Sequence, residues 1–280
     1  MSLKYFNNLT YEEIGEYNDK IVLFLHPKLL SHWIWKKQIE EYDKYFNNYH
    51  CIFIDLPHHG ESKFDGKFSI EESSDILIEF IKHLLNNKKS ESINIVAIGL
   101  GASIAIEILN KETHLINHII LSGLEIAQIR EKEEETIIKR LAKTKAEYLN
   151  MKPDQFIIKA YLRYYGIRKE YYDDLEKSLD IPIRKEEEIA YKSLNYIIPD
   201  FSKETIEKDN ILLVYGNKDN FNSTKSAIKL KKLFFNAKLI EIEKGNHLWN
   251  IIDYELFNQV IINFIQKEII FNDERIKEID

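Results

Sequence analysis

The stretch that decides the fold is Ile93-Asn-Ile-Val-Ala-Ile-Gly99-Leu-Gly101-Ala-Ser103-Ile-Ala-Ile-Glu107. Its first six residues are almost all apolar, which is typical of a strand buried in a parallel sheet. Gly99 and Gly101 indicate a sharp turn, and small residues open the segment that follows. The sequence therefore predicts a buried strand over 93–98, a turn at Gly99 and a helix over 101–111.

The same alternation of short apolar runs and amphipathic segments continues on both sides of this stretch. Strands are expected at about 21–26, 50–55, 93–98, 117–122, 211–216 and 238–242. Residues 9–15 alternate polar and apolar positions, which suits an antiparallel strand at a sheet edge. Helices are expected at about 34–46, 70–87, 101–111, 223–234 and 252–268. This order predicts an α/β fold in which helices cover both faces of a mostly parallel sheet.

Residues 125–205 interrupt the alternation and are expected to form a helical cap. They contain no strand-like run, and their apolar residues recur at helical spacing between Glu/Lys-rich stretches. Prolines and a glycine divide the segment into about four helices, at Pro153, Gly166, Pro182 and Pro199. Ligands bind at the carboxyl ends of the strands in open α/β sheets, so we expect the cap there, with aromatic side chains closing an apolar cavity above Gly99. Residues 1–124 and 206–280 would then form the core.

Composition excludes several classes of protein. The net charge of −7 over 280 residues argues against a nucleic-acid surface. No leader-like N-terminus and no apolar run of membrane-spanning length is present, which predicts a cytoplasmic protein with no membrane partner. The single cysteine, Cys51, lies in an apolar run and is expected to be buried.

Motifs for metals and nucleotides are missing from the sequence. Ile104 stands where a dinucleotide-binding G-x-G-x-x-G turn needs its third glycine, and there is no phosphate loop or metal-ligand cluster. We therefore expect no metal and no cofactor. The expected partner is a small molecule, and both a monomer and a homodimer stay open.

Four landmarks follow one another along the chain. They are the loop Leu25-His26-Pro27-Lys28 with its continuation to Trp35, the turn Asp55-Leu56-Pro57-His58-His59-Gly60-Glu61-Ser62, the turn Ala97-Ile98-Gly99-Leu100-Gly101, and the paired loops Tyr215-Gly216-Asn217-Lys218-Asp219 and Gly245-Asn246-His247-Leu248-Trp249. Together, over nearly the whole chain, they resemble the lid-bearing lipases and esterases of the α/β-hydrolase superfamily. The third landmark is similar to the nucleophile elbow Gly-x-Ser-x-Gly of that family, with Gly99 in place of the serine.

The resemblance assigns roles to particular residues. It makes His247 the triad base and Asp219 the acid that orients it, in the family's chain order of nucleophile, acid and base. Glu125 is an alternative acid. The oxyanion donors would be the backbone N–H groups of Leu100 and Lys28. In the family, the turn around Asp55 and His59 is structural, and Pro27 stands where a glycine is usual.

Gly99 has no hydroxyl group, so no acyl-enzyme can form at this position. Ser103 lies about one helical turn further on, and Ser31 and Ser122 would need an unrelated geometry. The missing side chain is expected to leave an opening of about the volume of one water molecule.

Three hypotheses follow from the missing nucleophile. The chain binds a small apolar or acyl-bearing molecule with lost or reduced hydrolase activity. Alternatively, His247 acts as a general base on water or on the substrate, as in a hydrolase, a lyase or an oxygenase. The third hypothesis is a non-catalytic interaction scaffold, which would not need Asp219 and His247. The residues also leave open that Gly99 was introduced into an ordinary serine hydrolase.

Overall fold

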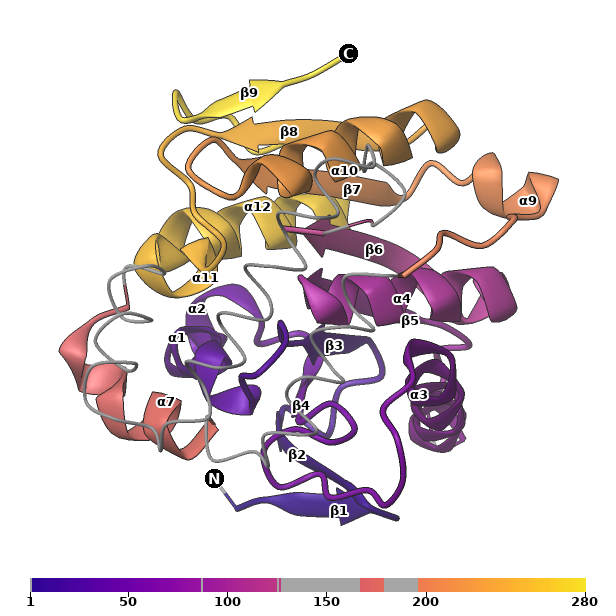
Figure 1. Cartoon of the computed structure of the whole chain (residues 1–280), viewed down its shortest axis with the longest axis vertical. Coiled ribbons are helices and arrows are strands. Elements are labelled where there is room, and N and C mark those ends of the chain that lie inside the picture. The colour runs from indigo at the N-terminus through magenta and orange to yellow at the C-terminus, as the bar shows by residue number, and fades with distance from the viewer. Residues whose placement is uncertain (1, 87, 125, 127–166, 179–195) are drawn as a thin grey trace.

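The computed structural model describes residues 2–86, 88–124, 126, 167–178 and 196–280, apart from the side chain of Phe221. Within these ranges, nine strands form one sheet in the order β1-β2-β4-β3-β5-β6-β7-β8-β9 (Figure 1). Their bounds are β1 Lys4–Phe6, β2 Leu9–Ile14, β3 Ile21–Leu25, β4 His50–Ile54, β5 Ile93–Ile98, β6 Ile116–Ser122, β7 Ile211–Gly216, β8 Lys238–Ile242 and β9 Ile276–Glu278. The strands from β4 to β8 in this order are parallel, and β1, β2 and β9 pair antiparallel.

The predicted fold class is confirmed, and each predicted parallel strand is present. The segment 9–15 contains the predicted antiparallel strand, β2, but the prediction that it lies at the edge is wrong. The three-residue strand β1 pairs with it on its outer side. At the opposite edge β9 pairs with β8. Both edge strands are too short to show the period-two alternation from which strands are predicted.

Helices cover both faces of the sheet (Figure 1). One face packs against α3 Ile70–Leu85, α4 Leu100–Lys111 and α10 Phe221–Leu233. The other face packs against α1 Lys36–Glu40, α2 Tyr42–Tyr45, α11 Trp249–Ile252 and α12 Tyr254–Lys267. Short 3-10 turns are found at η1 His32–Trp35 and η2 Thr113–Leu115. Each face therefore has its own apolar core, and Cys51 is buried in the second one, as predicted.

Two predicted helices are interrupted in the structure. The segment 34–46 is divided into η1, α1 and α2, because Trp35 and Glu41 leave the helical region with ψ angles of 8° and 13°. The segment 252–268 is divided at Asp253, which has φ −122° and ψ 52° and separates α11 from α12. Apolar periodicity does not detect such breaks, because the buried side of the segment is unchanged across them.

Most of the predicted cap lies outside the described residues, including Glu125 and more than half of its aromatic side chains. The described parts contain helical segments and no strand: η4 Lys169–Tyr171, α7 Tyr172–Ser178 and α9 Lys203–Ile206. The extent of the cap and the cavity beneath it stay predictions. Over the described ranges, no helix has the length and apolar character needed to span a membrane.

Candidate functional site

Gly99 forms the sharp turn between β5 and α4. Its φ of 58° and ψ of −115° lie in a region that L side chains rarely adopt. The Gly99 N–H donates to the Ser122 carbonyl at 3.0 Å, which ties the turn to the end of β6. Gly101 is needed for a different reason, because a Cβ there would stand 2.5 Å from the Leu25 carbonyl oxygen. The two glycines therefore allow the helix to start directly against the sheet.

The missing side chain at Gly99 faces His247. An ideal Cβ on Gly99 would stand 2.9 Å from His247 Nε2 and 3.0 Å from Pro27 Cβ. A side chain at position 99 would therefore be crowded by the ring and by Pro27, and the expected water-sized opening stays a prediction. Any acid–base chemistry at the Gly99 turn would have to use the His247 imidazole itself.

The loops after β7 and β8 hold each other in place. A Cβ on Gly216 would stand 2.1 Å from the Gly245 carbonyl oxygen, so only a glycine permits the two backbones to approach this closely. The Lys218 N–H donates to the same oxygen at 2.8 Å, and the Lys244 N–H donates to Asn217 Oδ1 at 2.8 Å. These contacts bring the side chains of the two loops together at the carboxyl edge of the sheet.

His247 and Asp219 form a hydrogen-bonded pair at this edge. His247 Nδ1 lies 3.2 Å from both Asp219 carboxylate oxygens. Asp219 also accepts from Ser223 Oγ at 2.8 Å and from the Asn220 N–H at 2.7 Å. The exposed fraction is 4% for the Asp219 side chain and 12% for the His247 side chain. This arrangement orients the imidazole with Nδ1 toward Asp219 and Nε2 toward Gly99.

The charge state of Asp219 suits a carboxylate that orients an imidazole. Burial alone would raise its pKa, but the neighbouring His247 and the hydrogen bonds from His247, Ser223 and the Asn220 N–H hold the pKa below its ordinary value. The carboxylate also lies at the start of α10, where the helix dipole favours a negative charge. Asp219 is therefore an anion at neutral pH and can stabilise a positive charge on the imidazole.

The backbone of the expected oxyanion loop is held by His26. This side chain is fully buried, and burial lowers its pKa to about 4, so the ring is neutral. Nδ1 lies 2.7 Å from the Pro27 carbonyl oxygen and donates to it, while Nε2 accepts from the Leu56 N–H at 2.9 Å. Because the peptide after Pro27 is trans, fixing its carbonyl oxygen also fixes the direction of the Lys28 N–H.

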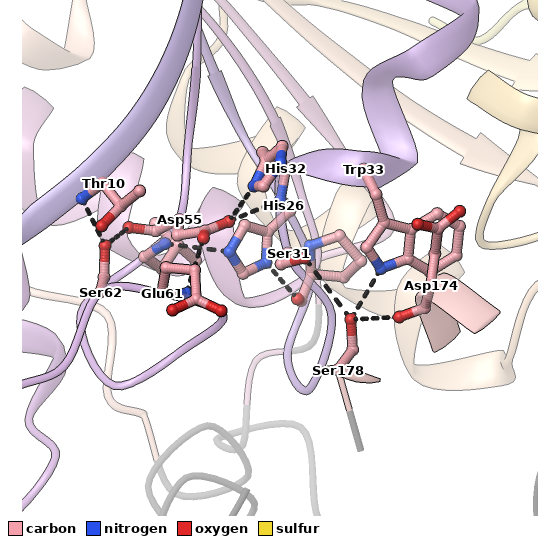
Figure 2. A network of polar contacts seen from close by, with 12 residues as sticks. Thr10, His26, Ser31, His32, Trp33, Asp55, Glu61, Ser62, Asp174 and Ser178 are labelled. Carbon is pink, nitrogen blue, oxygen red and sulfur yellow. Dashed lines mark hydrogen bonds and ion pairs between the residues drawn. The ribbon is translucent and has the colours of Figure 1, made fainter. Parts of the chain in front are cut away.

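A buried carboxylate anchors the same loop from the other side (Figure 2). Asp55 Oδ1 accepts from the His32 N–H and lies 2.7 Å from His32 Nδ1, and Oδ2 accepts from the Glu61 N–H at 2.8 Å. Burial disfavours both charges, but the hydrogen bond between them lowers the pKa of Asp55 and raises that of His32. Asp55 is thus a structural residue, as the resemblance implies, and His32 is its main partner.

The described part of the predicted cap contacts this loop through α7. Trp33 Nε1 donates to Ser178 Oγ at 2.7 Å, and Ser178 Oγ donates to the Asp174 carbonyl at 3.0 Å (Figure 2). The Trp33 ring also stacks on Tyr171, with centroids 5.6 Å apart. Residues from 171 to 178 are therefore fixed against the loop that carries Pro27 and Lys28.

The other candidate residues are buried or are bonded to partners outside the pair. Ser103 is buried in α4, and Ser31 Oγ lies 3.5 Å from Ser178 Oγ. Ser122 Oγ accepts from Trp249 Nε1 at 3.0 Å. His59 is fully buried, and its Nδ1 contacts the Pro57 carbonyl. Among the described residues, no group of three or more His, Cys, Asp or Glu side chains is placed to hold a metal.

Sequence reasoning missed Ser223, which donates to Asp219, and it also missed Gly123. Gly123 follows β6 with φ +61°, and an ideal Cβ there would stand 2.8 Å from His247 Nδ1. The only signal in the sequence is a glycine after a strand, which is common at any turn.

Comparisons with known proteins show which solved structures share this fold. No family model and no curated protein matches the sequence. Among solved structures, the chain is similar to an esterase from Exiguobacterium antarcticum, with TM-score 0.73, 16% identity, and 92% of this chain and 96% of that chain covered. A thermophilic esterase from Thermogutta terrifontis gives TM-score 0.71 and 19% identity over 92% and 93% of the two chains. MenH from S. aureus gives 0.69 and 19% over 92% and 98%.

These similarities, together with the strand order and the turn at Gly99, define the fold as an α/β-hydrolase fold. The matches extend over nearly the whole length of both chains. At such low identity they establish the fold alone, and function has to be argued from the residues around His247.

Proposed function

We propose that this chain is a hydrolase-like member of the α/β-hydrolase superfamily that acts on a small acyl-bearing molecule without a covalent intermediate. In this proposal His247 is a general base and Asp219 is the acid that orients it. Turnover is slow compared with that of a serine hydrolase, because Gly99 provides no nucleophile.

The observation that carries the proposal is the set of hydrogen bonds around Asp219. Ser223 Oγ, the Asn220 N–H and His247 Nδ1 all contact its carboxylate, which leaves the imidazole only one orientation toward Gly99. A scaffold protein has no use for a buried carboxylate that is held in place to polarise a histidine. Such pairs support general acid–base catalysis, which contributes about 10²–10⁴-fold to a rate.

The proposed reaction needs only water as a second reactant. His247 Nε2 accepts a proton from the water while the water oxygen bonds to the acyl carbon and the carbonyl electron pair moves onto its oxygen. The N–H groups of Leu100 and Lys28 are the proposed donors to this oxyanion. When the tetrahedral intermediate collapses, the bond to the leaving alcohol or thiol breaks, and the leaving group takes the proton from His247.

A second candidate function is ligand binding with little or no turnover. Pro27 favours it, because its Cβ lies 3.0 Å from the position of a Cβ on Gly99, where a working nucleophile would need room. Both candidates use the same small-molecule site. They differ in whether His247 moves a proton.

Steady-state turnover of short-chain esters and acyl thioesters separates these functions. The full chain is compared with His247→Ala, and His114→Ala is the matched control because its imidazole is exposed and lies away from Asp219. We expect His247→Ala to lower kcat/KM at least 100-fold and His114→Ala to leave it unchanged. Thermal shifts with the same compounds but no turnover would favour the binding protein. Neither binding nor turnover would favour an interaction scaffold.

A further inference from the structure

Two glycines lie against the His247 imidazole. Gly99 and Gly123 follow the neighbouring parallel strands β5 and β6, and both have positive φ, 58° and 61°. A Cβ on Gly99 would stand 2.9 Å from Nε2 of the ring. A Cβ on Gly123 would stand 2.8 Å from Nδ1 and 2.9 Å from Cε1 of the same ring. The imidazole therefore fills the space that side chains at both positions would need.

Gly123 also lies close to the acid. Its ideal Cβ would stand 3.2 Å from Asp219 Oδ2, so a side chain there would press on both members of the pair. The two Nδ1–carboxylate distances are already 3.2 Å, the upper end of the usual range for a hydrogen bond. A small displacement of the ring would therefore lose this interaction.

The backbone at Gly123 is not free to move away. Its N–H donates to the Val214 carbonyl at 3.2 Å, and the carbonyl of the preceding Ser122 accepts from the Gly99 N–H at 3.0 Å. These bonds join the ends of three adjacent strands. The strain of a side chain at position 123 would thus fall on His247 rather than on the sheet.

We propose that Gly123 is a positioning residue for His247, and that the absence of a side chain at this position is what allows the imidazole to reach Asp219. The inference rests on the proposed function, since it gives a catalytic purpose to the geometry of the pair. Gly123 touches no substrate and acts only through His247.

Proton NMR provides a test that does not depend on activity. An imidazole N–H that donates to a buried carboxylate gives a far-downfield signal, which His247→Gln assigns by removing it. The informative variants are Gly123→Ala and Gly123→Asn, because asparagine tolerates positive φ far better than alanine does but also carries a Cβ. Gly66→Ala is the matched control, since Gly66 has φ +84° and no atom within 4 Å of its ideal Cβ.

We expect both Gly123 variants to lose the downfield signal and to lower kcat/KM at least tenfold, while Gly66→Ala keeps both. A signal and turnover that survive in Gly123→Asn would overturn the proposal and assign the effect of alanine to backbone strain. If the wild-type chain shows the signal but turns over no ester or thioester, the proposed function fails. Loss of the signal in the two Gly123 variants would then still support the positioning role.

Discussion

Acidification should destabilise this protein through His26. The ring is fully buried and neutral, and both of its nitrogens are hydrogen-bonded, to the Pro27 carbonyl and the Leu56 N–H. A proton added to Nε2 removes the acceptor that Leu56 needs and places a charge in the core, which the nearby Asp55 carboxylate only partly offsets. Because the unfolded chain exposes an ordinary histidine, it binds that proton at a higher pH than the folded chain does.

The size of this effect follows from the pKa of His26. Burial lowers the value from 6.5 to about 4. Stability is therefore fully present above pH 6.5 and falls as the pH drops from 6.5 toward 4. A gap of this width corresponds to about 3 kcal/mol in the free energy of unfolding, at about 1.4 kcal/mol for each pH unit. His59, whose pKa burial lowers to about 3, adds a similar loss that extends to lower pH.

Denaturant unfolding between pH 7 and pH 4 measures the contribution of His26. The wild-type chain is compared with His26→Gln, which cannot take up the proton, and with His114→Gln, which removes an exposed imidazole. We expect the wild type and His114→Gln to lose about 3 kcal/mol more than His26→Gln over this interval. Parallel curves for all three chains would refute the assignment of a neutral, buried His26.

Two further predictions concern the pair and the turn. Ser223→Ala removes a hydrogen bond to a buried carboxylate, so it should lower the free energy of unfolding by about 2 kcal/mol, as measured by denaturant titration. It should also lower kcat/KM for ester turnover about tenfold. Unchanged values would show that Ser223 does not support Asp219. Gly99→Ser should gain slow labelling by a fluorophosphonate, and adding Pro27→Gly should speed it, because Pro27 Cβ lies 3.0 Å from where the new Cβ would stand. Equal labelling rates would show that Pro27 does not limit this position.

The parallel sheet and the loops of the site could be predicted because their signals are local. Buried parallel strands are continuous apolar runs, and Gly216 and Gly245 show directly in the sequence where two strands end. The edge strands β1 and β9 could not be predicted, since three residues contain no period. The break at Asp253 was missed because the apolar face continues from α11 into α12.

The spatial relations of the site were less accessible than its residues. The order of Gly99, Asp219 and His247 along the chain indicated a pair at one sheet edge, but nothing in the sequence shows how closely the ring approaches Gly99. The role of Gly123 depends on a contact between residues 124 positions apart. Such a contact exists only once the sheet has formed.

The central claim is that chemistry at this site proceeds through His247 without a nucleophilic serine. Its most direct test is the intact mass of the wild-type chain after incubation with a fluorophosphonate, with ester turnover measured on the same sample. We expect an unchanged mass and undiminished turnover. A stoichiometric adduct on any serine, accompanied by loss of turnover, would contradict it.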